Sequence, residues 1–444
     1  MAISPARKAA FEILMRVTQE ASYASELLHA DDMEKLSAAD HRLATELVMG
    51  VLRWQSALDA TITAYSSKKL RELDVPVLIS LRLGIYQLSF LDRIPPHAAI
   101  HESVELVKQS AKKSGAPFVN AVLRKSSTQA KRTLEARSSA ATAAELSRAW
   151  AHPQWMVERW LREFGAEAAA AICEYDQRQP EVSLHISNEK ALDEIQRDGI
   201  TLAPGLLVTS ARRVANGDVQ QTPAVRDGRV SIQDEASQLV ALLASHGEKI
   251  LDCCAAPGGK TRILAERNPM ASIVALELHP HRARLLRQRV RNSNVEVKTG
   301  DIAQLPGAGD FDVVLVDVPC SGTGTLARNP ETKWRLTAND LADLQQRQLT
   351  ILNSAMKHVA PGGRLVYSTC SMETEENEAI VEKAMAVHPT FALVDSRKEL
   401  ERLRASGDLA WPSIDSLVRG QYLRTTPGIH RCDGFFAAIL GKRE

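Results

Sequence analysis

From about residue 230 onward, short apolar runs alternate with longer stretches of helical periodicity, and this alternation constrains the fold more than any other feature. Strands separated by helices of this length pair in parallel through right-handed crossovers. The pattern therefore predicts a doubly wound, mostly parallel α/β sheet of the Rossmann kind. The expected strands are 250–251, 273–276, 313–316, 365–367 and 435–440, and the expected helices are 282–291, 340–358 and 375–387.

The rest of the chain shows other hydrophobic patterns, which divide it into three further segments. Residues 1–127 repeat apolar side chains at helical spacing, as at Leu78, Leu81, Ile85 and Leu88, and predict an all-α bundle. Residues 128–179 indicate connecting helices. Residues 180–229 predict a small α/β module with an alternating strand near Leu184, a helix over 191–197 and a strand over 206–208. The expected domains are thus 1–127, 128–179, 180–229 and 230–444.

Composition excludes several classes of protein. Among 444 residues, 44% are hydrophobic and 25% charged, which is typical of a globular chain and not of a disordered or membrane-spanning one. The first residues lack the apolar core of a signal peptide, so we expect a cytoplasmic protein. Six cysteines include no C-x-x-C pair, so neither a disulfide framework nor a zinc site is expected.

The formal net charge of +1 hides a basic segment. Residues 108–137 carry eight Lys/Arg and one acidic residue, which gives +7. Either a solvated helix face or a phosphate-binding surface for nucleic acid accounts for this run. The tryptophans at 150, 155 and 160 are interpreted as helix packing in preference to base stacking.

Carboxylates and thiols follow successive strands of the predicted sheet. Ligands of such sheets bind beyond the carboxyl ends of the strands, where the strand order reverses. Helix capping explains one or two strand-end carboxylates, but not a whole set of them. The residues at these positions are Asp252, Glu277, Asp301, Asp317, Cys320 and Cys370.

The loop after the first strand, Asp252 to Thr261, ends in Gly-Lys-Thr but is not a triphosphate-binding loop, because Cys254 stands where that motif needs glycine. Its glycines and the following helix N-terminus suit a single carboxylate. Glu277 lies 25 residues beyond Asp252, near the spacing of a ribose-binding acid. A nicotinamide cofactor is disfavoured because G-x-G-x-x-G is absent, which leaves S-adenosylmethionine, with Glu277 and Asp301 toward its adenosine.

Two thiols at neighbouring strand ends point to a particular methyl transfer. Amines and hydroxyls accept a methyl group without help from an enzyme nucleophile, whereas C5 of a pyrimidine is too electron-poor. A thiolate that adds to C6 makes C5 nucleophilic, and an acid such as Asp317 near N3 stabilises the adduct. A free thiol has a pKa of about 8.5, so it needs local activation or such acid assistance.

These residues resemble a known family. The segments ILDCCAAPGGKT (250–261), DVPCSG (317–322) and STCS (368–371) resemble the RNA cytosine-5 methyltransferases in order and spacing. QDEASQL, PETKW, PGG and DGFF, starting at residues 233, 330, 361 and 433, add to the likeness. Residues 94–107 and 118–124 resemble the NusB-type RNA-binding domain. The whole chain is similar to bacterial 16S rRNA cytosine-5 methyltransferases that carry this domain and an RRM-like module.

The resemblance implies a role for each site residue. Cys370 would attack C6 and Cys320 would assist product release; because DNA cytosine-5 enzymes attack with the Pro-Cys thiol, Cys320 remains the alternative nucleophile. His185 and Ser187 stand where relatives show Arg and Asn, so the resemblance carries no RNA contact over to them. The cofactor would contact Cys254, Ala255, Ala256, Pro257, Gly258, Gly259, Lys260, Glu277, Asp301 and Asp317.

The expected activity is methyl transfer from S-adenosylmethionine to C5 of a specific cytosine in 16S rRNA or a small-subunit precursor, by a monomer with no membrane partner. The target base would leave its stack to reach the thiols. Two alternatives stay open at this point. The acceptor could be tRNA, another RNA or a protein, or the chain could be a non-catalytic RNA-binding scaffold.

Overall fold

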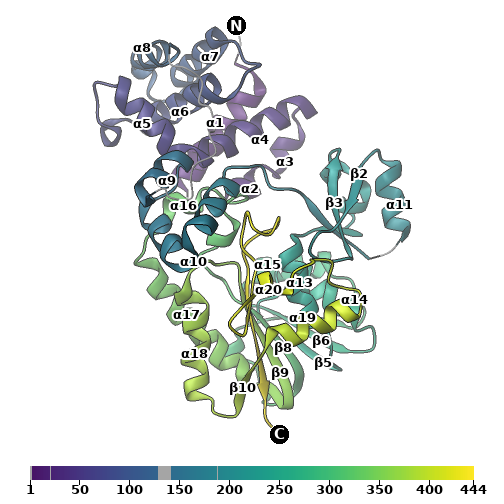
Figure 1. The fold of residues 1–444 in the computed structure, drawn as a ribbon. Helices are drawn as coiled ribbons and strands as arrows, with labels where there is room; N and C mark the ends of the chain where they lie inside the picture. Colours follow the sequence, from purple (N-terminus) through teal and green to yellow (C-terminus); the bar gives the residue numbers. More distant parts are fainter. Residues whose placement is uncertain (1–2, 21, 129–141, 188) are drawn as a thin grey trace. The chain divides into compact units, whose positions relative to one another are not determined.

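The computed structural model describes residues 3–20, 22–128, 142–187 and 189–444. The chain divides into two compact units (Figure 1). The helical unit comprises residues 1–179 and 326–335, and the α/β unit comprises residues 180–325 and 336–444. None of the helices in the described parts of the chain combines the length and apolar character that a membrane span requires.

The helical unit is built around α6 (Val75–Phe90), which is apolar on all sides and packs against five other helices. Local signals fix the helix starts: Ser37 Oγ accepts the Asp40 N–H ahead of α4, and Thr142 and Glu145 form a capping box ahead of α9. The predicted all-α bundle is confirmed. Its other helices are α1 (Pro5–Gln19), α2 (Ala24–Leu27), α3 (Asp31–Glu34), α4 (Ala38–Arg53), α5 (Gln55–Tyr65), α7 (Pro96–Gln109), α8 (Ala116–Ser126), α9 (Ala143–Trp150) and α10 (Gln154–Tyr175).

The PETKW segment belongs to the helical unit, although it lies between two strands of the α/β sheet in sequence. It forms α16 (Thr332–Arg335). The buried Lys333 Nζ donates to the carbonyl oxygens of Arg53 (3.1 Å) and Ala151 (3.2 Å). Burial lowers the pKa of Lys333 to about 7. Glu331 Oε1 accepts the Ala24 N–H at 2.8 Å, so both charged side chains of the motif serve packing in this unit.

The α/β unit begins with a small module whose antiparallel sheet has the order β2-β3-β1-β4. The predicted strand over 206–208 is wrong. The Glu235 carboxylate accepts the backbone N–H groups of Leu206, Leu207 and Val208, and this holds the segment as a loop. The elements are β1 (Ser183–Ile186), α11 (Glu189–Arg197), β2 (Thr201–Pro204), β3 (Ala211–Asn216), α12 (Pro223–Arg226) and β4 (Val230–Ile232).

His185 in β1 and Ser187 just after it, the two residues that depart from the family pattern, join this module to the rest of the α/β unit. His185 Nε2 lies 2.6 Å from Glu266 Oε2, and Ser187 Oγ donates to Glu266 Oε1 at 2.6 Å. Arg262 donates to both Glu266 (2.7 Å) and Ser187 (2.8 Å). These polar contacts lower the pKa of Glu266 to about 2 against the effect of its burial. His185 and Ser187 thus fix the module to α14 (Gly259–Arg267), the helix that follows the glycine loop.

The main sheet of this unit has nine strands, and its predicted doubly wound arrangement is confirmed for the parallel part. The order is β11-β12-β13-β9-β8-β5-β6-β7, and β10 pairs with β13. The pairs from β9 to β7 are parallel, and those among β10 to β13 and between β13 and β9 are antiparallel. The strands are β5 (Lys249–Asp252), β6 (Ser272–Glu277), β7 (Val295–Thr299), β8 (Phe311–Asp317), β9 (Val359–Thr369), β10 (Phe391–Val394), β11 (Val418–Arg419), β12 (Tyr422–Arg424) and β13 (Phe436–Lys442).

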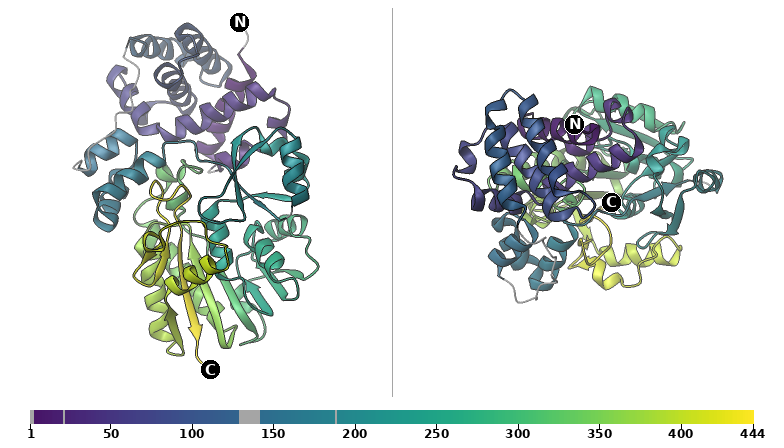
Figure 2. Two further views of the ribbon diagram at one scale, coloured as in Figure 1. Left: turned by 45° about the vertical axis from the view of Figure 1, so that its right-hand side comes forward. Right: turned by 90° about the horizontal axis from the view of Figure 1, so that it is seen from above.

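Helices cover both faces of this sheet (Figures 1 and 2). Alternate strand residues point to opposite faces, so Val313 and Leu315 join one core cluster while Val314 and Val316 join the other. The first cluster includes α13 (Glu235–Leu243), α14 and α19 (Ser396–Ala405), and the second includes α17 (Asp340–Met356) and α18 (Glu378–Val387). The remaining helices are α15 (Pro280–Arg289) and α20 (Ile414–Leu417).

Candidate active site

The strand order reverses between β5 and β8. From β5 the chain continues to β6 and β7 on one side, and it then returns to β8 and β9 on the other side. The loops after β5 and β8 therefore flank the position where open parallel sheets bind ligands. The Asp252–Thr261 loop and the Asp317–Gly322 loop both lie there, as the sequence predicts.

Lys260 and Asp317 link these two loops. Lys260 Nζ, at the start of α14, lies 2.7 Å from Asp317 Oδ2 at the end of β8. Asp317 Oδ1 accepts the Ser368 hydroxyl of the neighbouring strand β9 at 2.7 Å. The ammonium also lies over the ring of Phe435, 5.1 Å from its centroid. The pair is only partly exposed, with side-chain accessibilities of 13% for Lys260 and 26% for Asp317.

Cys320 and Cys370 come together at the ends of the parallel strands β8 and β9. Their sulfur atoms are 3.2 Å apart, and both residues are half-buried. The adjacent Cys370 thiol and burial raise the pKa of the Cys320 thiol well above its usual range. This environment favours the protonated form of the Cys320 thiol. The remaining thiols are not part of this pair, and Cys173, Cys253 and Cys432 are buried.

The glycine loop could hold an amino-acid group. Gly258 has φ +108°, and a Cβ there would lie 2.7 Å from Val290 Cγ2. A Cβ on Gly259 would lie 2.9 Å from Gln233 Oε1, a buried acceptor without a hydrogen-bond partner. Backbone amides at the start of α14 can receive a carboxylate, and the unused Gln233 oxygen can receive an ammonium group.

Asp252 and Cys254 precede the glycines of the loop. Thr261 Oγ1 donates to Asp252 Oδ2 at 2.7 Å, and burial raises the pKa of Asp252 to about 6. Cys254 is half-buried, and burial raises the pKa of its thiol.

Glu277 and Asp301 lie at the ends of β6 and β7 and differ in exposure. Glu277 is 3% exposed, and its Oε1 accepts the His279 N–H at 2.9 Å. Arg282 approaches Glu277 Oε2 at 4.0 Å. Asp301 is exposed and caps a short 3-10 turn by accepting the Ala303 N–H at 2.9 Å. Each keeps one oxygen free of these main-chain bonds.

Glu376, Phe435 and Gln233 also contribute to the site, although the sequence argument assigned them no role. Glu376 contacts the loops of both cysteines, and Phe435 packs under Lys260. Glu376 lies in an acidic run that is indistinguishable by sequence from the charged first turn of a helix. Phe435 and Gln233 lie within the DGFF and QDEASQL segments, so the family resemblance of these segments could have identified both residues.

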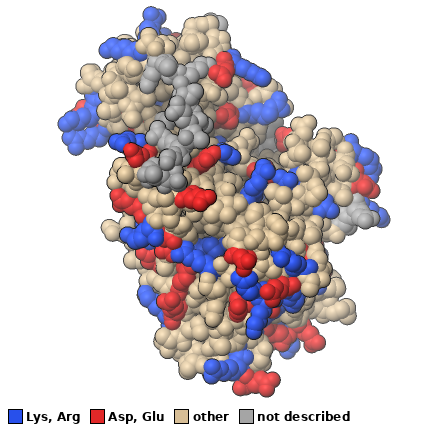
Figure 3. Space-filling model, in the orientation of Figure 1, with Lys and Arg blue, Asp and Glu red and all other residues tan. Residues whose placement is uncertain are grey.

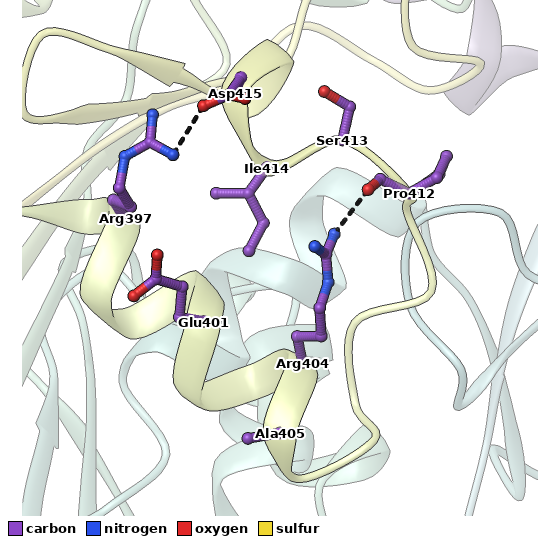
Figure 4. Close-up of a pocket in the computed structure, with 8 residues that line it drawn as sticks. All are labelled: Arg397, Glu401, Arg404, Ala405, Pro412, Ser413, Ile414 and Asp415. Atoms are coloured by element: carbon purple, nitrogen blue, oxygen red, sulfur yellow. Dashed lines mark hydrogen bonds and ion pairs between the residues drawn. The ribbon is translucent and has the colours of Figure 1, made fainter.

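A separate pocket lies between α19 and the segment that follows it (Figure 4). Arg397 Nη1 pairs with Asp415 Oδ1 at 2.7 Å, and Arg404 Nη2 donates to the Pro412 carbonyl at 3.0 Å. Arg404 also donates to the Trp411 carbonyl oxygen, at 2.6 Å. The pocket includes none of the strand-end residues, so we assign it no part in the site.

The described part of the basic segment lies on α7, α8 and the turn between them. Lys112, Lys113, Arg124 and Lys125 are exposed, and Figure 3 shows Lys and Arg side chains on the surface of the helical unit. Lys108 pairs with Glu105 at 2.6 Å, a contact of the kind expected for a solvated helix face. The remainder of the segment, 129–137, lies outside the described residues.

Comparisons with known proteins agree with this architecture. Residues 239–441 match the family model described as 16S rRNA methyltransferase RsmB/F, residues 4–128 match the NusB family, and residues 152–219 match the RsmF/B-like ferredoxin-like domain. The chain is 33% identical over 452 residues to the probable ribosomal RNA small subunit methyltransferase B of Bacillus subtilis, covering 98% of each chain. Identity to the corresponding Klebsiella pneumoniae protein is 32%, over 93% of this chain and 92% of that one.

Solved structures share the fold. The structure of PH0851 aligns over 100% of both chains with a TM-score of 0.80 at 24% identity. A methyltransferase homologue from Pyrococcus horikoshii aligns over 68% of this chain and 98% of its own, with a TM-score of 0.54 at 23% identity. The full-length similarity to the curated relatives, with all three family models in order, means that the chain belongs to the RsmB/F family of 16S rRNA methyltransferases with NusB and ferredoxin-like domains.

Proposed function

We propose that the chain transfers a methyl group from S-adenosylmethionine to C5 of a cytosine in 16S rRNA through a covalent adduct between Cys370 and C6. The observation that carries this proposal is the 3.2 Å separation of the Cys370 and Cys320 sulfurs, at the ends of the same two strands that Asp317 and Ser368 join by a hydrogen bond. Methylation of an amine or hydroxyl needs no such thiol pair. The family membership supports the choice of ribosomal RNA as the substrate.

The residues of the glycine loop fit S-adenosylmethionine. The backbone amides at the start of α14 and the unpartnered Gln233 oxygen suit its amino-acid end, and Glu277 and Asp301 have oxygens available for ribose hydroxyls. When bound, this group supplies an electrophilic methyl carbon on a sulfonium. A structural neighbour, NSun6 from Pyrococcus horikoshii, was solved with SFG, and it aligns with a TM-score of 0.55.

In this proposal the thiolate of Cys370 adds to C6 of the cytosine, and the electron pair of the C5–C6 bond moves toward N3. The Lys260–Asp317 pair holds a proton that can move to N3 and so neutralises the charge of the adduct. C5 then has enamine character and can accept the methyl group. After methylation, the C5–H electron pair re-forms the C5–C6 double bond as the bond between C6 and the Cys370 sulfur breaks. The C5 proton passes to Cys320 while the Cys320 thiol proton moves to the departing Cys370 sulfur, and the N3 proton returns to the Lys260–Asp317 pair.

The rest of the chain would deliver the RNA. The exposed Lys and Arg side chains of α7 and α8 offer phosphate contacts, while the target base is unstacked so that its C6 edge reaches Cys370. One chain carries every residue that the chemistry requires, so we propose that it acts as a monomer on 16S rRNA or a small-subunit precursor.

The direct test uses S-adenosylmethionine with a labelled methyl group, the purified full-length chain, and 16S rRNA or small-subunit particles from cells lacking the gene. We expect labelled 5-methylcytosine in the hydrolysed RNA, and none with the Cys370→Ala variant. Labelled methyl groups found in tRNA alone would show that the substrate is tRNA and not 16S rRNA. RNA binding without any methyl transfer would favour a scaffold, and full activity of Cys370→Ala would refute the assigned nucleophile.

A further inference from the structure

The carboxylate of Glu376 is fully buried and accepts four hydrogen bonds. Its Oε1 accepts the backbone N–H of Ser321 at 2.8 Å and the Gln348 side-chain amide at 2.8 Å. Its Oε2 accepts the hydroxyl groups of Ser321 and Ser371. An ionised carboxylate offers about four acceptor positions, so this set fills the group completely. The desolvation of the buried charge is offset by these donors.

The donors connect the carboxylate to both cysteines. Ser321 directly follows Cys320, and Ser371 directly follows Cys370. The two serine hydroxyls are 3.1 Å apart, so the carboxylate lies against the meeting point of the two loops. Any shift of one cysteine-bearing loop along its strand must stretch a bond to Glu376.

Glu376 is itself held firmly. The Tyr367 hydroxyl, on β9, donates to the Glu376 carbonyl oxygen at 2.6 Å. The next residue, Asn377, accepts the Thr369 hydroxyl and donates to the Ser371 carbonyl oxygen at 2.9 Å. The carboxylate therefore acts from a fixed position behind the cysteines and not from a mobile side chain.

Other bonds keep the loops adjacent without this carboxylate. The Gly324 N–H donates to the Cys370 carbonyl oxygen at 2.9 Å, and the Met372 N–H donates to Thr323 Oγ1 at 2.9 Å. Both bonds involve the part of the first loop beyond Ser321. A variant at Glu376 can therefore keep the two loops together while it loses control of the turn that carries Cys320.

We propose that Glu376 is a positioning residue that sets the separation and orientation of the Cys320 and Cys370 sulfurs. The consequence for catalysis rests on the proposed function, in which Cys370 forms the adduct and Cys320 assists its release. The geometric part does not rest on it. Glu376 bonds to the residue after each cysteine and is assigned no contact with the RNA base or the methyl donor.

The geometric part can be tested by oxidation. Hydrogen peroxide can take two electrons and two protons from the thiol pair, which forms a disulfide while the peroxide becomes two molecules of water. The sulfurs must close from 3.2 Å to about 2.05 Å for this bond. The disulfide is identified by the loss of two hydrogen atoms from the linked peptides, and the Cys320→Ser variant identifies the pair.

We expect Glu376→Ala to slow this cross-linking about tenfold or more, because four donors lose their common acceptor. Glu376→Gln keeps one acceptor oxygen and should lie between Glu376→Ala and the wild type. The matched control is Leu403→Ala on α19, which truncates a fully buried leucine and removes no hydrogen bond to Glu376 or to either loop. It lowers stability, yet its cross-linking should match the wild type under conditions where each variant is folded.

A second readout follows the RNA adduct. With 16S rRNA and S-adenosylmethionine, Glu376→Ala and Glu376→Gln should lower turnover and raise the fraction of protein retained as covalent adduct on denaturing gels. Leu403→Ala should leave this adduct fraction at the wild-type level. Cross-linking and adduct levels in Glu376→Ala equal to those of Leu403→Ala would overturn the positioning role. If the wild type transfers no methyl group, the proposed function fails, while the cross-linking rates still decide the role of Glu376.

Discussion

The ammonium group of Lys260 and the carboxylate of Asp317 meet at 2.7 Å across the point where the strand order reverses. The two residues come from loops 57 positions apart in the chain. From the sequence, Lys260 is expected to contact the cofactor, and Asp317 is expected both to contact the cofactor and to act near the pyrimidine. On the proposed function, their contact with each other makes them one proton-holding pair that links the glycine loop to the loop of Cys320.

We expect Lys260→Met and Asp317→Asn each to lower the single-turnover rate of methyl transfer by about 100- to 1000-fold, the range seen when one preorganised charge-stabilising group is removed. The physical reason is that neither variant can hold the proton destined for N3. Rapid-quench measurement of labelled methyl transfer gives the rate, and calorimetry gives the affinity for S-adenosylmethionine.

The matched control is Lys298→Met, since Lys298 lies on β7 and pairs only with the exposed Glu296 among the contacts described for it. Its rate should equal that of the wild type. If Lys260→Met binds S-adenosylmethionine weakly but keeps the wild-type single-turnover rate, Lys260 binds the cofactor and takes no part in proton transfer.

The two thiols should fail in different ways. Cys320→Ala should accumulate a covalent protein–RNA adduct, because Cys370 still attacks C6 while the release step loses its assisting thiol. Cys370→Ala should form no adduct, because it lacks the thiol that attacks C6 and Cys320 acts only in the release step. Denaturing gels with end-labelled RNA distinguish the two cases, and an adduct in Cys370→Ala but not in Cys320→Ala would exchange their roles.

Glu277→Gln should weaken S-adenosylmethionine binding about tenfold, or about 1.4 kcal/mol, because a charged acceptor for ribose hydroxyls becomes a neutral one. The turnover rate at saturating cofactor should change little. Glu296→Gln makes the same substitution at an exposed surface ion pair and should leave the affinity unchanged. An unchanged affinity for Glu277→Gln would remove this residue from the cofactor site.

The strand-end residues could be found from sequence because a parallel sheet brings the ends of its strands to one edge. Asp317, Cys320 and Cys370 follow strongly apolar runs, so their positions were determined by local pattern and one topological rule. Their pairing at 3.2 Å follows from the parallel register of β8 and β9, in which Asp317 is opposite Ser368.

Other features depend on contacts that no local pattern encodes. The segment 206–208 has the apolar character of a strand, but three of its N–H groups bond to Glu235, which lies 27 to 29 positions later in the chain. Lys333 looks like a surface lysine in sequence, yet it is buried against carbonyl groups of the helical unit. The role of Glu376 likewise depends on donors from three separate segments.

A buried histidine near the active site should make stability depend on pH. His430 is 1% exposed, its Nδ1 accepts the Thr426 N–H at 2.8 Å, and burial lowers its pKa to about 4. It lies in the segment that leads to Gly434, whose N–H donates to the Gly324 carbonyl in the Cys320 loop at 2.8 Å. Protonation of Nδ1 would abolish its acceptor role and detach this segment.

In the unfolded chain, the histidine has its ordinary pKa of about 6.5, so between pH 6.5 and 4 the unfolded state binds more protons than the folded state. The contribution of neutral His430 to the free energy of unfolding is therefore fully present above pH 6.5 and is lost as the pH falls from 6.5 through 4. At pH 5 the loss amounts to about 2 kcal/mol. His430→Asn places an amide oxygen near the Nδ1 position and does not titrate. Between pH 7.5 and pH 5, the free energy of unfolding of this variant should therefore fall by about 2 kcal/mol less than that of the wild type. Urea denaturation at the two pH values measures this difference, and parallel losses in both proteins would show that His430 is not the titrating group.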